Sequence, residues 1–192
     1  MIGAMSEARR KATYADLLAL PDHLVGEILA GEVVTSPRPA TPHARASTIA
    51  GGELATSFDR KPGGPRGPGG WWILDEPELH LGEEVLVPDL AGWRRERVPE
   101  GLGGAALTVV PDWICEVLSP ATGRHDRLRK MPVYARHRVA HAWLIEPIQR
   151  TLEVYRLQGE HWLLTAAFGD EEFVRAEPFE AIEVELSRWW LE

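Results

Sequence analysis

Three segments decide the fold of this chain: residues 85–91 read VLVPDLA, residues 113–119 read WICEVLS, and residues 124–134 read RHDRLRKMPVY. The first two are short apolar runs bounded by Pro, Gly or Ser, a pattern that predicts buried β-strands. Each run carries one acid, Asp89 or Glu116. A buried carboxylate is costly unless a cation or hydrogen bonds compensate for it. Lys130, in the basic third segment, is the candidate cation.

The size and composition of the chain are those of an ordinary globular protein. It has 192 residues, 44% of them hydrophobic and 26% charged, enough to bury a core. We predict a flexible N-terminal arm over residues 1–12 and a single domain over residues 13–192, with a Gly/Pro-rich loop at residues 60–70. Cys115 is the only cysteine, which excludes an intrachain disulfide and a cysteine-based zinc site within one chain.

Charge and hydropathy limit the cellular location and the binding partners that can be expected of the protein. Residues 1–11 lack the apolar core of a signal peptide, and no run is long enough to cross a bilayer, so we expect a cytoplasmic protein. The formal net charge of −8 argues against a protein that coats nucleic acid through charge alone. Residues 124–141 are locally basic, which suits contact with phosphate or, equally, a solvated helix face.

The remaining segments show clear periodicities and turn signals. Residues 13–20 and 42–59 have the pattern of helices, and residues 28–35 that of a hairpin with Ala30-Gly31 at its turn. Further strands are predicted over residues 71–74, 78–81, 142–145, 151–157 and 161–168, the last two as an antiparallel pair.

Eight tryptophans, including adjacent pairs at residues 71–72 and 189–190, are more large aromatic side chains than a core of this size readily covers. We therefore predict a homodimer, with the C-terminal pair at an edge or an interface.

The two acids and the lysine point to a reaction. Carboxylate oxygens suit Mg²⁺ or Mn²⁺, which stabilises charge growing on a phosphate and lowers the pKa of a bound water. A lysine ammonium alongside can orient that water and neutralise charge in the transition state. Asp89, Glu116 and Lys130 thus match the needs of phosphodiester hydrolysis.

The sequence resembles the PD-(D/E)XK nuclease superfamily, and more closely its Uma-two family of restriction-endonuclease-like proteins. The resemblance rests on Val87-Pro88-Asp89 and on residues 114–120 (ICEVLSP), and it covers roughly residues 13–164. Further matching stretches are residues 27–32 (EILAGE), Ser36-Pro37 followed by His43, Asp126 and Lys130 with Tyr134, and residues 143–147 (WLIEP).

The resemblance implies an α/β (α+β) fold, in which helices flank a mixed central sheet with a restriction-endonuclease-like core and a C-terminal antiparallel hairpin. It also implies that Asp89 and Glu116 bind the metal, joined by the Val117 carbonyl, and that Glu27 and Lys130 complete the catalytic set. The superfamily places its lysine two residues after the acid, where this chain has Leu118; Lys130 matches a lysine moved to the next helical segment. The resemblance also points to a homodimer.

Three functions stay open from the sequence. The first is a Mg²⁺-dependent endonuclease acting on DNA. The second is a non-catalytic, dimeric, nucleic-acid-associated or scaffold protein that keeps the nuclease fold. A glycosidase with an acid pair is weaker, because no aromatic sugar platform is recognisable. Structural alternatives accompany several residues: His43 as a structural helix residue, Asp126 and Ser119 as caps of the turn between them, and Tyr134 as core.

Overall fold

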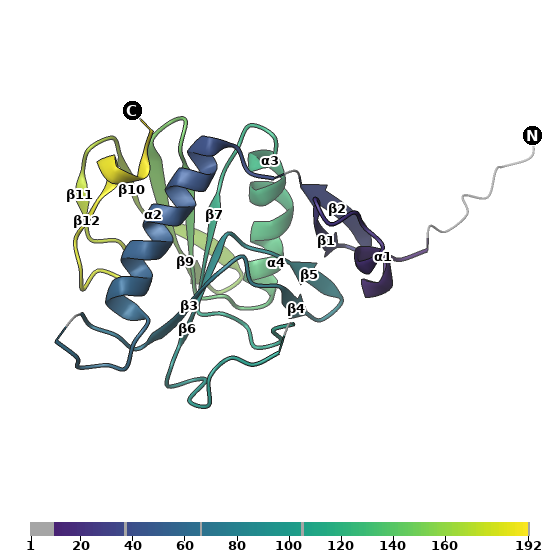
Figure 1. The fold of residues 1–192 in the computed structure, drawn as a ribbon, viewed down its shortest axis with the longest axis horizontal. Coiled ribbons are helices and arrows are strands. Elements are labelled where there is room, and N and C mark those ends of the chain that lie inside the picture. Colours follow the sequence, from purple (N-terminus) through teal and green to yellow (C-terminus); the bar gives the residue numbers. More distant parts are fainter. Residues whose placement is uncertain (1–9, 37, 66, 105, 192) are drawn as a thin grey trace, which may run out of the picture.

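A mixed six-stranded β-sheet forms the centre of the computed structural model and lies between helices on its two faces (Figure 1). The structure describes residues 10–36, 38–65, 67–104 and 106–191. The strands are β1 (Val25–Leu29), β2 (Glu32–Ser36), β3 (Trp71–Asp75), β4 (Leu79–Leu81), β5 (Glu84–Leu86), β6 (Leu90–Arg94), β7 (Trp113–Val117), β8 (His141–Glu146), β9 (Thr151–Gln158), β10 (His161–Gly169), β11 (Phe173–Val174) and β12 (Val184–Glu185). The helical segments are α1 (Tyr14–Leu18), α2 (Thr41–Phe58), α3 (Gly123–His125), the π-helical η1 (Asp126–Lys130), α4 (Met131–Arg136) and the 3₁₀ segment η2 (Leu186–Trp189).

The central sheet has the strand order β10-β9-β8-β7-β6-β3. Strands β7 and β8 are parallel, and every other neighbouring pair in this sheet is antiparallel. A smaller sheet, β2-β1-β5-β4, lies beside it. The expected mixed sheet flanked by helices is confirmed, as is the antiparallel pair formed by β9 and β10.

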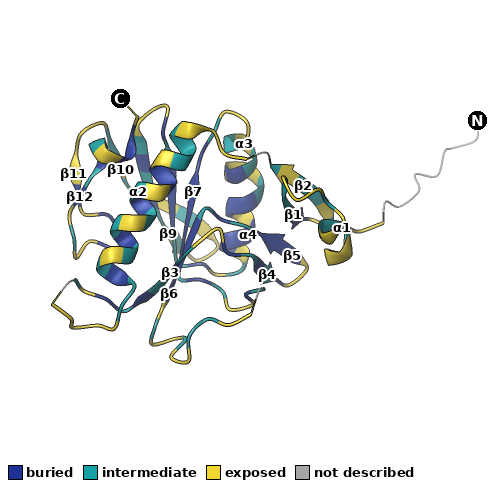
Figure 2. Ribbon diagram, viewed as in Figure 1, coloured by how far each residue is buried: buried dark blue, intermediate teal, exposed yellow. Residues whose placement is uncertain are grey.

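Alternation along β7 divides the core into two layers. Trp113, Cys115 and Val117 belong to the cluster that contains α2 and the C-terminal elements. Ile114 belongs to the other cluster, with side chains of α4 and the smaller sheet. Because successive strand residues point to opposite faces, Glu116 shares the α4 face with Ile114. Figure 2 shows β7 as one of the buried strands at the centre of the molecule.

The segment 85–91 is not one strand, contrary to the prediction. Its first part belongs to β5 of the smaller sheet, and its last part belongs to β6 of the central sheet. The chain passes between the two sheets through Val87, Pro88 and Asp89. Proline has no N–H to give to a ladder, so Pro88 marks the crossing. This link places Asp89 at the end of the central sheet instead of within a strand.

The predicted helices and hairpin agree with the structure. Residue Thr13 precedes α1, and its N–H donates to the Asp16 carboxylate at 2.7 Å, as expected of a capping box. Strands β1 and β2 form the hairpin around the Ala30-Gly31 turn, where both residues have positive φ. Described residues of the Gly/Pro-rich loop form no helix or strand.

The tryptophans pack within the chain, so their number gives no reason to expect an interface. Six are buried: Trp71, Trp93, Trp113, Trp143, Trp189 and Trp190. Three of these, Trp71, Trp113 and Trp143, surround Phe179 with ring centroids 4.8–5.5 Å away. A core built on aromatic rings therefore covers the C-terminal pair.

Residues 1–9 of the predicted N-terminal arm lie outside the described residues. Residues 10–12 contact the folded part, where the Ala12 N–H donates to the Gly31 carbonyl and Lys11 pairs with Glu83 at 2.7 Å. No helix in the described ranges is both long enough and apolar enough to cross a membrane.

Candidate active site

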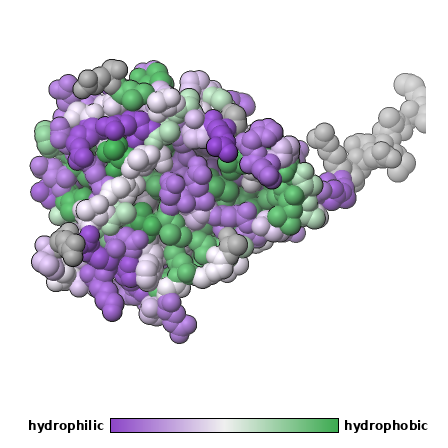
Figure 3. Space-filling view, in the orientation of Figure 1, coloured by the Kyte–Doolittle hydropathy of each residue, from purple (hydrophilic) through white to green (hydrophobic). Residues whose placement is uncertain are grey.

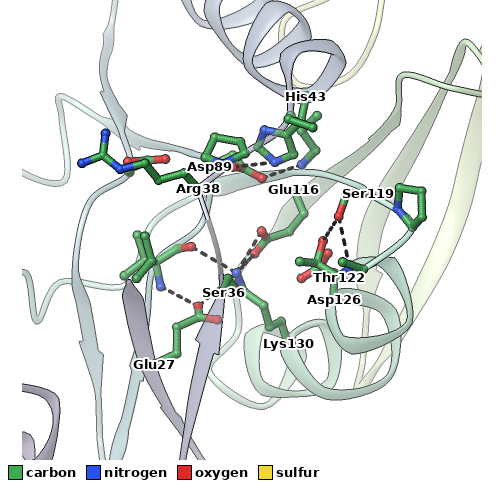
Figure 4. A pocket seen from close by; sticks show the side chains of 18 residues that line it. Glu27, Ser36, Arg38, His43, Asp89, Glu116, Ser119, Thr122, Asp126 and Lys130 are labelled. Carbon is green, nitrogen blue, oxygen red and sulfur yellow. Dashed lines mark hydrogen bonds and ion pairs between the residues drawn. The ribbon is translucent and has the colours of Figure 1, made fainter. Parts of the chain in front are cut away.

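A cavity of about 270 Å³ opens where the link at residues 87–89, the end of β7, the start of α2 and the α3–η1 segment meet (Figure 4). Five acids line it, together with the two bases Arg38 and Lys130 and with His43. The five acids are Glu27, Glu76, Asp89, Glu116 and Asp126. The cavity therefore has a surplus of negative charge.

Lys130 lies at the centre of this cluster, and only 4% of its side chain is exposed. Its ammonium is 2.9 Å from the Glu116 carboxylate and 3.0 Å from the Glu27 carboxylate, and it donates to the Val87 carbonyl at 3.1 Å. Glu27 also accepts the Val87 N–H at 2.8 Å. The lysine thus joins β1, the 87–89 link and β7.

A π-helical turn aims Lys130 at the acids. In η1 the Met131 N–H donates to the Asp126 carbonyl, five residues earlier, and such turns occur often at functional sites. Asp126 and Lys130 are both buried there and line the same cavity. One turn further on, Tyr134 is fully buried and its hydroxyl donates to Glu116 at 2.6 Å. Glu116 is therefore held from two successive turns of one helical segment.

Asp89 lies beside Glu116 because the β6–β7 register pairs Leu90 with Cys115. One Asp89 oxygen accepts the Val117 N–H at 2.7 Å, and the other is 3.1 Å from His43 Nε2. Although burial lowers it, the hydrogen bond and charge of Asp89 raise the pKa of His43 above its ordinary value. His43 thus contributes positive charge on the α2 side of the cavity when it is protonated.

Burial and mutual repulsion control the protonation of the acids. Burial raises the pKa of Glu116 well above its usual range, and the charges of Asp126, Asp89 and Glu27 add to this while Lys130 opposes it. Burial likewise raises the pKa of Asp126 to about 6. Although burial alone would lower it, the surrounding carboxylates raise the pKa of Lys130, so its ammonium stays charged. One buried ammonium does not balance these acids.

The structure brings together all the residues that the sequence singled out: Glu27, Asp89, Glu116, Val117 and Lys130 line one cavity. Four residues of the site lacked a clear functional signal. His43 and Tyr134 were favoured as structural, whereas His43 lines the cavity and Tyr134 holds Glu116. Glu76 and Arg38 had no signal at all, because their roles depend on loops that join distant strands.

The side chains around the cavity include ligands suited to a divalent cation. Oxygen ligands and surplus negative charge suit Mg²⁺ or Mn²⁺, and Asp89 and Glu116 provide both. All three carboxylates already have partners: Glu27 and Glu116 contact Lys130, and Asp89 contacts the Val117 N–H and His43. Within the described ranges no three His, Cys, Asp or Glu side chains are grouped closely enough to hold a metal. The residue types fit such an ion, and Asp89 and Glu116 are the carboxylates that would hold it.

An acid-rich cavity around a buried lysine, at the end of a mixed sheet, is the arrangement expected of restriction-endonuclease-like nucleases. The family model described as "Putative restriction endonuclease", Uma2, matches residues 14–188, and the chain belongs to this family.

The fold is also similar to a solved structure from Anabaena variabilis, described as a putative nuclease belonging to DUF820. The TM-score is 0.74 at 21% identity, and the match covers 93% of this chain and 97% of the other. A comparison with curated proteins found no match.

Proposed function

We propose that the protein is a Mg²⁺- or Mn²⁺-dependent endonuclease that hydrolyses phosphodiester bonds, with DNA as its substrate. The observation that carries the proposal is the buried ammonium of Lys130 among Glu27, Glu116 and their neighbours in an open cavity. Burying a lysine with its acid partners costs desolvation free energy. A catalytic role at the cavity would explain why the chain keeps this ion pair. Membership of the Uma2 family supports the same proposal.

In this proposal each residue has a distinct part. Asp89, Glu116 and the Val117 carbonyl would hold the ion, which supplies charge stabilisation and a bound water of lowered pKa. Lys130 would place its positive charge beside the attacked phosphate. Glu27 holds the lysine ammonium at 3.0 Å, and Tyr134 holds the Glu116 carboxylate at 2.6 Å. Both therefore act as positioning residues.

A cleavage assay on supercoiled plasmid DNA with Mg²⁺ or Mn²⁺ tests the proposal. Wild-type protein should nick or linearise the plasmid, and chelation should stop it. Glu116→Gln, which keeps the size of the side chain, should lose at least about 10²-fold in rate, the usual effect of removing one group that stabilises the transition state. Wild-type activity in that variant would refute the assignment.

A second candidate is a non-catalytic, nucleic-acid-associated or scaffold protein that keeps the nuclease fold. It is favoured by the finding that no three His, Cys, Asp or Glu side chains of the described residues are grouped closely enough to hold a metal. A purely structural pairing of Lys130 with two carboxylates would look the same. This alternative predicts no cleavage by wild type with any divalent ion, and no change in melting temperature when the ion is added.

We also propose a homodimer, on a different basis from the tryptophans. Strand β10 is an edge strand of the central sheet, and it exposes Leu163 (42%) and Leu164 (49%). Phe173, just after it, is 65% exposed. An edge strand with exposed apolar side chains is a ready partner for another strand, and a second copy of this chain would supply one.

A further inference from the structure

Most arginines in the described part of the chain have a side-chain partner, and a few have none. Most exposed arginines contact a carboxylate: Arg127 pairs with Glu153 at 2.6 Å, and Arg156 pairs with Glu177 at 3.3 Å. Among the described residues, the side chains of three exposed arginines have no hydrogen bond, ion pair or ring contact: Arg38, Arg45 and Arg124. A fourth, Arg94, has no carboxylate partner but stacks on the Trp71 ring. In a chain with a formal net charge of −8, carboxylate partners are plentiful, so three unpaired guanidinium groups stand out.

All three unpaired arginines lie around the candidate active site. Arg38 lines the cavity itself, in the segment that leads into α2 (Figure 4). Arg45 is two residues after the cavity residue His43 on α2, and Arg124 lies between the cavity residues Thr122 and Asp126 on the other side. These segments come from the two helical layers that flank the sheet (Figure 1). One unpaired arginine thus lines the cavity, and the other two lie on segments that adjoin it from the two helical layers.

Arg45 also lines a second hollow, of about 480 Å³, with Arg150 and Arg188. The Arg150 guanidinium donates to the Leu191 carbonyl at 3.2 Å, and Arg188 pairs with Glu53. Among the described residues, Glu171 is the one acid that lines this hollow. Arg150 follows β8, whose parallel pairing with β7 puts both carboxyl ends at the same edge of the sheet. In Figure 3 the strip over α2 is mostly of intermediate hydropathy, with hydrophilic patches beside it.

The charge of the cavity explains why such arginines are needed. Five acids line it against Arg38 and Lys130, so a polyanion approaching it without an ion meets repulsion. Affinity for a phosphate backbone must come from cations outside the acid cluster. Guanidinium groups bind phosphate through paired, charge-assisted hydrogen bonds, and a guanidinium without a protein partner has all its donors available.

We propose that Arg38, Arg45 and Arg124 bind backbone phosphates of the nucleic acid on either side of the bond to be cleaved, with the hollow around Arg45 as one phosphate subsite. This proposal rests on the nuclease function proposed above. The contacts are to phosphate, so they fix the position of the strand and read no sequence.

The test is the affinity of a fluorescently labelled DNA duplex, measured by anisotropy over a range of salt concentrations with EDTA present. The test variant replaces Arg38, Arg45 and Arg124 with Gln. The matched control replaces Arg138, Arg156 and Arg175 with Gln, which removes the same charge from arginines that pair with surface acids. Because the test arginines have no described partner, that variant should melt at the wild-type temperature.

The test variant should bind at least about tenfold more weakly than wild type, and its salt slope should be less steep by about 0.9 for each phosphate that is no longer neutralised. The control should keep the wild-type slope. Equal weakening in both variants would overturn the proposal, because net charge alone would then account for binding. Wild-type affinity and slope in the test variant would overturn it as well.

Further results distinguish this proposal from the proposed nuclease function and from a site for free phosphate. Arginine-dependent DNA binding by a wild type that never cleaves would support the inference and refute the nuclease. Cleavage by wild type together with unaltered binding by the test variant would refute the inference alone. Inorganic phosphate that binds at the three arginines, without any DNA binding, would also refute the inference.

Discussion

Replacing Lys130 with Met should destabilise the protein strongly, and the deficit should depend on pH. Methionine is close to lysine in length but removes the ammonium that contacts Glu116 at 2.9 Å and Glu27 at 3.0 Å. Breaking a buried ion pair by deleting one partner costs about 3–5 kcal/mol, because the other charge stays buried without compensation. The free energy of unfolding of such a domain is about 5–15 kcal/mol, so the variant should be only marginally stable.

The pH dependence follows from the protonation of Glu116. Burial and repulsion already raise the folded-state pKa of Glu116, and without the Lys130 ammonium nothing opposes them. An acid with a raised folded-state pKa destabilises the fold above that pKa, and the penalty fades as the pH falls toward the unfolded value of about 4.3. Keeping one glutamate neutral at pH 8 costs at most about 5 kcal/mol, and about 1 kcal/mol at pH 5. The deficit should therefore shrink between pH 8 and pH 5.

Urea unfolding at pH 8, 6.5 and 5 measures this deficit directly. Lys11→Met is the matched control, because its ammonium pairs with Glu83 at 2.7 Å where both side chains are largely exposed. That control should unfold like wild type at every pH. A Lys130→Met variant as stable as wild type at pH 8, or a deficit that stays constant down to pH 5, would refute the ion-pair account of this site.

Three further predictions concern Asp126, Tyr134 and strand β10. Asp126→Asn should stabilise the metal-free protein by on the order of 1–3 kcal/mol at pH 8, because the pKa of Asp126 is raised to about 6. The gain should vanish near pH 4. Chemical unfolding that shows destabilisation at both pH values would contradict this prediction. Tyr134→Phe removes the hydrogen bond to Glu116 and should lower the free energy of unfolding by about 1.5–3 kcal/mol. The urea midpoint should fall accordingly, and an unchanged midpoint would count against the prediction. Light scattering at tens of micromolar should give a dimer for wild type and a monomer for Leu164→Glu, whereas a wild-type monomer would rule out the proposed β10 interface.

The sequence indicated the two acids of the site by their positions in short apolar runs. Asp89 and Glu116 each interrupt a short apolar run, a pattern that predicts buried strands, and the family resemblance implied that the two acids converge. The chain instead crosses between two sheets at Pro88, because the missing N–H ends one ladder before the next begins. That crossing depends on which strands pair over long distances, which a local pattern does not reveal.

The rest of the site depends on geometry that single residues do not encode. Lys130 reaches the acids through a π-helical turn, and nothing in its local sequence marks a five-residue hydrogen bond. Tyr134 was predicted to be a core residue and is buried in the core, but its hydroxyl also donates a hydrogen bond to Glu116. The tryptophans suggested an interface because a count of aromatic residues cannot show that they pack around Phe179.

The position of a bound ion tests the central claim most directly. Crystals soaked in millimolar Mn²⁺ should show an anomalous peak between the carboxylates of Asp89 and Glu116, and the peak should be absent from Glu116→Gln crystals. A wild-type crystal with no peak at these carboxylates, and with the Lys130 ion pairs unchanged, would contradict the account.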